Sequence, residues 1–244
     1  MSWPCRTLAP ALLVLTMMLS SAPVLLFSGA PAWADFAAGR ASYEIGDMRA
    51  AREQWQALAE AGDSASQAAL GSLYIHGEGV HIDYRKALKW TQMAAEQGDM
   101  TGQFNMGSIY ASGLGVERDY GVAAYWFRLA GDQYDSVSRY NLAILYSRGL
   151  GVERDDGEAV FLLNTTAIIA GTPEIGLTEL AGQAEHLALN LMMTMNQADI
   201  QEAHDRSKEF EREYIEYYMK FYFGSKRARQ NPSEDSQQDS QQEP

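Results

Sequence analysis

The sequence predicts an all-α fold, a solenoid built from antiparallel helix pairs. The 244-residue chain repeats itself with a period of 36 residues. Each period holds two stretches with the apolar spacing of a buried helix, joined by a short glycine-rich loop. A period of about 20 to 50 residues is typical of solenoids, in which each unit buries its apolar face only against its neighbours.

The period runs through three copies without a gap. Residues 113–119, GLGVERD, recur unchanged at residues 149–155. The columns that align are Tyr74, Tyr110 and Tyr146; Gly77, Gly113 and Gly149; Gly79, Gly115 and Gly151; and Asp83, Asp119 and Asp155.

The first helix of a repeat is predicted over residues 65–76 in the first full copy. Leu70, Leu73 and Tyr74 lie at the three and four spacing of a buried stripe. Gly77 ends the helix, because glycine reaches the left-handed backbone region without a side-chain clash.

The second helix of the same copy is predicted to begin after Asp83. The aspartate side chain accepts hydrogen bonds from the free backbone amides of the first helical turn. Ala87, Trp90 and Ala94 mark the face that packs against the first helix. We expect the indole of Trp90, and the residues of its column, to fill the gap between the layers.

Residues 1–34 are predicted to be an export signal that is cleaved after Ala34. No charged residue stands between Arg6 and Asp35, and small residues occupy the −3 and −1 positions of the cleavage site. We expect export to a bacterial periplasm. The alternative is an uncleaved membrane anchor, because a bilayer takes about 20 apolar residues.

Residues 172–224 are predicted to form two helices that cover the open end of the stack. The first begins with Thr172 as N-cap and Pro173 at the first helical position. The second begins with a capping box at Thr194. Residues 225–244 hold almost no apolar side chain and are predicted to be a disordered acidic tail.

The repeats resemble the Sel-one-like repeat (SLR) family, a relative of the tetratricopeptide repeat. Residues 66–90 and 102–126 match its pattern closely, whereas the third copy has Ala143 for the helix glycine and Leu162 for the tryptophan. The predicted units are a degenerate leading repeat at 35–64 and three full repeats at 65–100, 101–136 and 137–171. The resemblance implies a right-handed superhelix that binds proteins or peptides, and it implies no reaction.

Composition argues against several classes of function. The chain carries 32 Asp and Glu against 19 Lys and Arg, a net charge of −13, which disfavours binding to a nucleic-acid backbone. The single cysteine, Cys5, lies in the export signal. His76, His81, His186 and His204 have no metal-binding spacing. We therefore predict no metal, no cofactor and no catalytic residue.

The resemblance places a partner-binding groove on the first helices of the repeats. In tetratricopeptide-like stacks these helices line the concave side. The predicted groove comprises Ala68, Ser72 and His76; Phe104, Ser108 and Ser112; and Tyr140, Ile144 and Arg148. Its aromatic and polar side chains suit an extended or helical peptide. The alternative is that Phe104 and Tyr140 pack between repeats.

A second candidate surface lies on the last helix. Phe210, Tyr214, Tyr217 and Phe221 follow at helical spacing, and Tyr218 widens the stripe. This aromatic face either caps the solenoid, or contacts a partner or a second copy. A third alternative is contact with a membrane surface, because Lys226, Arg227 and Arg229 follow the aromatic residues.

Together these features predict a non-catalytic periplasmic adaptor or scaffold that holds a protein partner in its groove, in an envelope assembly or a regulatory complex. The alternative is a hydrolase of cell-wall or β-lactam substrates, since some exported proteins of similar sequence have been linked to such ligands. Those proteins brace their repeats with cysteine pairs that this chain lacks, and no Ser-x-x-Lys motif follows the export signal.

Overall fold

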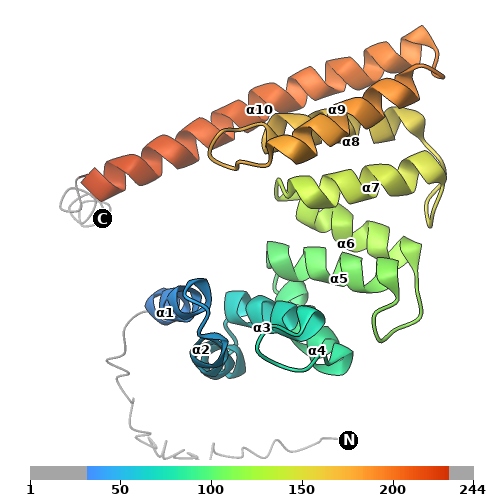
Figure 1. Ribbon diagram of the computed structural model, residues 1–244. Coiled ribbons are helices and arrows are strands. Elements are labelled where there is room, and N and C mark those ends of the chain that lie inside the picture. Colours follow the sequence, from blue (N-terminus) through green and yellow to red (C-terminus); the bar gives the residue numbers. More distant parts are fainter. Residues whose placement is uncertain (1–31, 231–244) are drawn as a thin grey trace, which may run out of the picture. The chain divides into compact units, whose positions relative to one another are not determined.

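The computed structural model describes residues 32–230, with side chains from residue 36 to residue 220. In this part of the chain every regular element is a helix, so the all-α prediction is confirmed (Figure 1). The helices are α1 (Ala32–Glu44), α2 (Met48–Glu60), α3 (Ser64–His76), α4 (Tyr84–Glu96), α5 (Met100–Ser112), α6 (Tyr120–Asp132), α7 (Ser136–Arg148), α8 (Asp156–Ala170), α9 (Thr178–Met192) and α10 (Gln197–Gln230).

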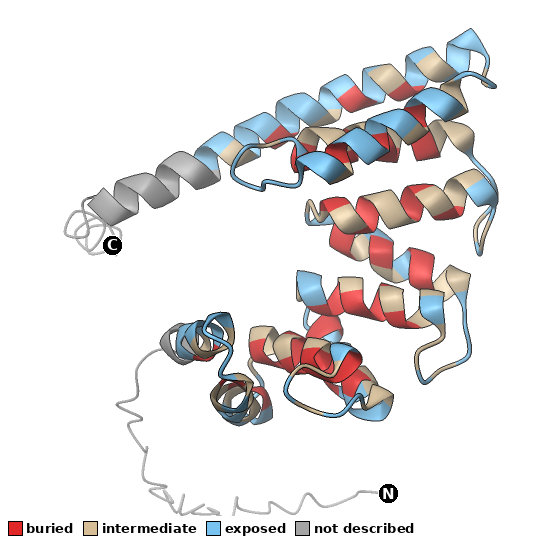
Figure 2. Ribbon diagram, viewed as in Figure 1, coloured by how far each residue is buried: buried red, intermediate tan, exposed pale blue. Residues whose placement is uncertain are grey.

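The helices pack in chain order. Each odd-numbered helix from α1 to α7 packs against the helix that follows it, and each pair packs on the next pair. One buried hydrophobic cluster spans α2 to α5 and a second spans α6 to α9. Figure 2 shows the buried residues on the faces between consecutive helices, while most of α10 is exposed. The apolar interior is therefore a series of contacts between neighbours, as the period predicts.

An aspartate precedes every helix from α2 to α8. In each case its carboxylate accepts a hydrogen bond from a backbone N–H of the first turn, which satisfies a donor that has no partner inside the helix. These caps are Asp47, Asp63, Asp83, Asp99, Asp119, Asp135 and Asp155. The capping role predicted for the column of Asp83 is confirmed.

Two glycines shape each loop between a first and a second helix. Gly113 ends α5 in the left-handed conformation, with φ of 70°. Gly115 also has positive φ, and a Cβ atom there would lie 2.6 Å from Cβ of Tyr84. Only glycine therefore lets this loop lie against the start of α4, the second helix of the preceding repeat.

Trp90 is buried in the core of the first repeat, as predicted, but in the second repeat the gap between the two helices is filled by a residue one position later. Trp126 is half-buried and lies edge-on to Tyr125. Phe127 is buried, and its ring leaves only 2.5 Å for a Cβ at Gly107. In the third repeat Ala143 stands at the position of Gly107 and Leu163 at the position of Phe127. A larger residue on the first helix is therefore paired with a smaller one on the second.

The predicted start of the helix after the third repeat is wrong. Residues 173–175 form a turn, and α9 begins only at Thr178, after Leu177, which makes no side-chain cap. The hydroxyl of Thr172 donates instead to the carbonyl of Ile168 at the end of α8. Gly176, with φ of 70°, turns the chain into α9.

The last helix also differs from the prediction at both ends. Asn196 caps it, because its Oδ1 accepts the backbone N–H of Asp199 at 2.9 Å. The hydroxyl of Thr194 bonds back to the carbonyl of Leu191. The helix continues to Gln230, so residues 225–230 are helical and do not belong to a disordered tail. Residues 231–244 lie outside the described part of the chain.

The other terminus carries the predicted export signal. Residues 1–31 lie outside the described part, and α1 begins at Ala32. The predicted cleavage position after Ala34 therefore falls within the first turn of α1.

The pairing of Gly107 with Phe127 generates a stability prediction. Gly107→Ala should lower the free energy of unfolding by about 1–3 kcal/mol, because the new methyl group meets a well-packed ring. Adding Phe127→Leu, which reproduces the third repeat, should recover at least about 1 kcal/mol of that loss in a double-mutant cycle. Urea unfolding followed by circular dichroism measures both values. Additive effects of the two substitutions would contradict this packing.

Candidate partner-binding site

The predicted groove residues lie on α3, α5 and α7, the first helices of the three repeats. Ser72 on α3 is half-buried and ties two repeats together. Its Oγ donates to the carbonyl of Ala68 at 3.2 Å and accepts a hydrogen bond from Nδ2 of Asn105 at 2.9 Å. Ala68 is itself buried. This part of the predicted groove therefore serves the contact between α3 and α5.

The two aromatic residues of the groove are both half-buried. The ring of Phe104 packs 6.2 Å from that of Phe127, centroid to centroid, within the second hydrophobic cluster. Tyr140 packs against the same cluster. Ile144, one turn further along α7, is half-buried as well. The aromatic side chains thus support the packing between helices and are only partly accessible.

The remaining groove residues are more accessible. Ser108 is half-buried, and His76, Ser112 and Arg148 are exposed. Within residues 36–220, the side chains of Ser108, Ser112 and Arg148 and the hydroxyl of Tyr140 form no hydrogen bond or ion pair. α5 and α7 therefore present hydroxyl groups and one guanidinium that are available to an external partner.

A buried chain of amides links the repeats, and the sequence analysis missed it. Gln67 donates from Nε2 to the carbonyl of Ala59 at the end of α2 and accepts at Oε1 from Gln97, at 3.0 and 2.7 Å. One repeat later, Gln103 accepts from Gln133 at 2.7 Å. Because these amides recur at a spacing of 36 residues, the period contained the signal that could have revealed them.

Arg139 takes the place of this glutamine in the third repeat. It is only 6% exposed, and its Nε donates to the carbonyl of Gly131 at 2.8 Å. A second guanidinium nitrogen donates to Oγ1 of Thr165 on α8. The guanidinium also lies 4.4 Å from the ring centroid of Phe210 on α10. Burial lowers the pKa of Arg139 below its ordinary value, and the negative charge of Asp132 opposes that shift.

The predicted aromatic face of α10 packs on the same region of the chain. Phe210 is half-buried, stacks on Tyr214 and meets the ring of Phe161 edge-on. Tyr214 is buried, and its hydroxyl lies 3.2 Å from that of Thr172. Tyr218 is half-buried beside it. These rings therefore cover the end of the stack; the side chain of Phe221 lies outside the described residues.

Tyr217 completes the cluster by stacking on a residue of the turn between α6 and α7. Its ring lies 4.7 Å from that of Tyr134, centroid to centroid, and it remains 49% exposed. Tyr134 adopts φ of 69°, and it is the only non-glycine residue with positive φ in the described part of the chain. One and two repeats earlier, Gly98 and Gly62 occupy this position. A left-handed tyrosine costs about 1–2 kcal/mol, which the contact with α10 offsets.

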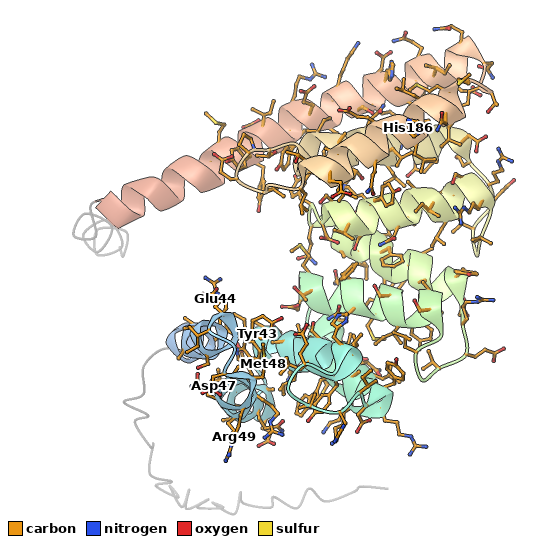
Figure 3. The ribbon with its side chains drawn as sticks, viewed as in Figure 1. Tyr43, Glu44, Asp47, Met48, Arg49 and His186 are labelled. Atoms are coloured by element: carbon orange, nitrogen blue, oxygen red, sulfur yellow. The ribbon has the colours of Figure 1, made fainter. Side chains whose placement is uncertain are left out.

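Within the described residues, no group of three or more His, Cys, Asp or Glu side chains is placed to hold a metal ion. His186, labelled in Figure 3, is exposed on α9, and His76 ends α3. None of the helices in the described part combines the length and apolarity needed to cross a membrane.

The geometry defines a helical-repeat protein, and comparison with known sequences identifies the type of repeat. Residues 64–99, 101–135 and 136–167 match the Sel1 repeat. These segments contain α3 to α8, with one helix pair in each. The chain is therefore a helical-repeat protein in which three consecutive segments are similar to the Sel1 repeat. No curated protein shows significant similarity to it.

Two solved structures show the same fold. A Sel1 repeat protein from Oxalobacter formigenes shares 27% identity at a TM-score of 0.52, over 57% of this chain and 58% of that chain. The protein c5321, described as a protective antigen of uropathogenic Escherichia coli with an SLR fold, shares 26% identity at a TM-score of 0.53. That match covers 78% of this chain and 49% of c5321. The chain thus spans about half of the solved proteins that it matches.

The contact between Tyr134 and Tyr217 generates a second stability prediction. Tyr134→Gly removes the left-handed strain but also loses the stacking on α10. We therefore compare Tyr134→Gly in two backgrounds, the wild type and Tyr217→Ala. In the Tyr217→Ala background, where the stacking is already lost, we expect the change in the free energy of unfolding caused by Tyr134→Gly to be more favourable by about 0.5–1.5 kcal/mol. Guanidinium unfolding of the four proteins of the cycle measures this coupling. A matched cycle with Tyr125→Ala, an exposed ring on α6, should show none; zero coupling with Tyr217 would disprove the proposed compensation.

Proposed function

We propose that this protein is a non-catalytic adaptor or scaffold that is exported to the periplasm and binds a protein partner on α5 and α7. One observation carries the proposal. The hydroxyls of Ser108, Ser112 and Tyr140 and the guanidinium of Arg148 have no partner within the described residues. They lie on the same two helices as the half-buried side chains of Tyr140 and Ile144. Aromatic and arginine side chains beside polar groups are enriched where proteins bind each other.

The similarity to helical-repeat proteins supports a role as a protein-binding adaptor or scaffold. Helical-repeat stacks expose extended surfaces along consecutive first helices, and such surfaces commonly bind proteins or peptides. The partner-binding region that we propose is narrower than the predicted groove. Ser72 supports a contact between two repeats and Phe104 packs on Phe127 of α6, whereas the more accessible groups are Ser108, Ser112, Tyr140 and Arg148 on α5 and α7.

A charge reversal at the exposed end of α7 tests the binding surface. Arg148→Glu combined with Tyr140→Phe retains the aromatic packing and removes the two strongest polar contacts available to a partner. We expect at least about fivefold lower recovery of the partner in affinity capture from envelope extract, because truncating a central contact costs about 1–3 kcal/mol. Arg118→Glu, an exposed charge reversal in the loop before α6, serves as the control. If the wild type, the double variant and the control recovered the partner equally, this surface would not be the binding site.

Export is tested separately, by the N-terminus of the protein isolated from its native cells. Mass spectrometry of the periplasmic fraction should find a chain that begins at Asp35, because signal peptidase cleaves after small residues. A full-length N-terminus in the membrane fraction would support the uncleaved anchor instead.

A further inference from the structure

A cavity of about 630 Å³ lies at the junction of α2 and the loop between α3 and α4. Arg52 of α2 lines it from one side, and His81 of the loop and Lys86 of α4 line it from the other. Tyr74 contributes part of the wall, with Lys86 Nζ 5.1 Å from its ring centroid. The cavity thus brings together three basic side chains from separate parts of the chain.

Two contacts hold α1 and α2 against this loop. The hydroxyl of Tyr43 donates to Oε2 of Glu78 at 2.7 Å. Met48 lies under Gly79, so closely that a Cβ on the glycine would lie 2.2 Å from Cβ of Met48. Figure 3 labels Tyr43 and Met48 where α1 and α2 meet. Because these contacts fix the start of α2, Arg52 is placed one turn further along on the wall of the cavity.

One carboxylate lines the cavity, and it is already engaged. Asp83 caps α4 by accepting the backbone N–H of Lys86, and this hydrogen bond lowers the pKa of the carboxyl group. Its other oxygen lies 3.5 Å from Nζ of Lys86. Within residues 36–220, Arg52 has no hydrogen bond or ion pair. The wall therefore keeps a surplus of positive charge, although the whole chain has a net charge of −13.

The basic character of this site is not required by the repeat. At the position of His81, the second and third repeats have Glu117 and Glu153. At the position of Lys86 the third repeat has Glu158. The same loop geometry is therefore compatible with the opposite charge, and the basic side chains of the first repeat need another explanation.

We propose that this cavity binds the acidic segment at residues 231–244 of the same chain. That segment carries four carboxylate side chains and no basic residue, and its carboxylates are Glu234, Asp235, Asp239 and Glu243. Salt bridges to Arg52 and Lys86 would give the guanidinium of Arg52 the partner that it lacks among residues 36–220. The segment directly follows α10 in the same chain. A tethered segment that spans the distance to its site has an effective concentration of the order of 1 mM, so weak individual contacts then suffice to fill the site.

A labelled synthetic peptide of residues 231–244 tests the proposal by fluorescence anisotropy against the full chain. The reference protein is a full-length variant with a neutral segment: Glu234→Gln, Asp235→Asn, Asp239→Asn and Glu243→Gln. We expect it to bind the peptide at least about threefold more tightly than the wild type, whose own segment competes. Binding should weaken with added salt, because exposed ion pairs are screened.

The cavity itself is tested in the neutral-segment background. Arg52→Glu with Lys86→Glu should weaken peptide binding at least about tenfold, and the milder Arg52→Gln with Lys86→Gln should weaken it in the same direction if the charge reversal impairs folding. The control, Arg118→Glu with Arg212→Glu, changes the net charge by the same amount as the charge reversal in the cavity. It should leave the affinity for the peptide within about twofold. Equal binding by the cavity variants and the control, or by the wild type and the neutral-segment variant, would overturn the proposal.

Discussion

The structure depends on one constraint: each helix pair buries its apolar face only against its neighbours, so every pair must meet the next in the same register. Two recurring features hold that register. Second-position loop glycines such as Gly115 let each loop lie against the preceding repeat. Buried glutamines such as Gln67 and Gln103 tie helix ends together through side-chain amides. An amide buried without a partner is costly, so these hydrogen bonds disfavour alternative alignments of the repeats.

Two residues near the end of the stack depart from the earlier repeats, Tyr134 in the turn before α7 and Arg139 on α7, and both contact α10. Arg139 stands where the earlier repeats have a buried glutamine, and its guanidinium stacks on Phe210. Tyr134 stands where the earlier repeats have a left-handed glycine, and its ring stacks on Tyr217. Each residue is unfavourable by itself, one as a buried charge and the other as a strained backbone. Together they form the surface on which the aromatic side of α10 packs. The last helix is therefore an integral part of the end of the stack.

Much of the fold could be predicted from the sequence, because the period, the loop glycines and the capping aspartates are local signals. The boundaries of α9 and α10 could not, since Thr172 and Thr194 match capping patterns but bond back to the preceding helix. The groove was predicted only in part. Periodicity locates a helix face, but which of its residues pack in the interior, as Phe104 does against Phe127, depends on contacts with neighbouring helices.

Hydrogen exchange on wild type and Arg139→Gln tests most directly whether α10 is docked on the third repeat. Glutamine restores the residue of the other repeats and can still reach the carbonyl of Gly131, but it loses the contact with Phe210. The structure predicts faster exchange in α8 and α10 of the variant, with exchange in α3 to α5 unchanged, because solenoid contacts are local. Unchanged exchange in α10, or a uniform increase along the chain, would contradict this arrangement.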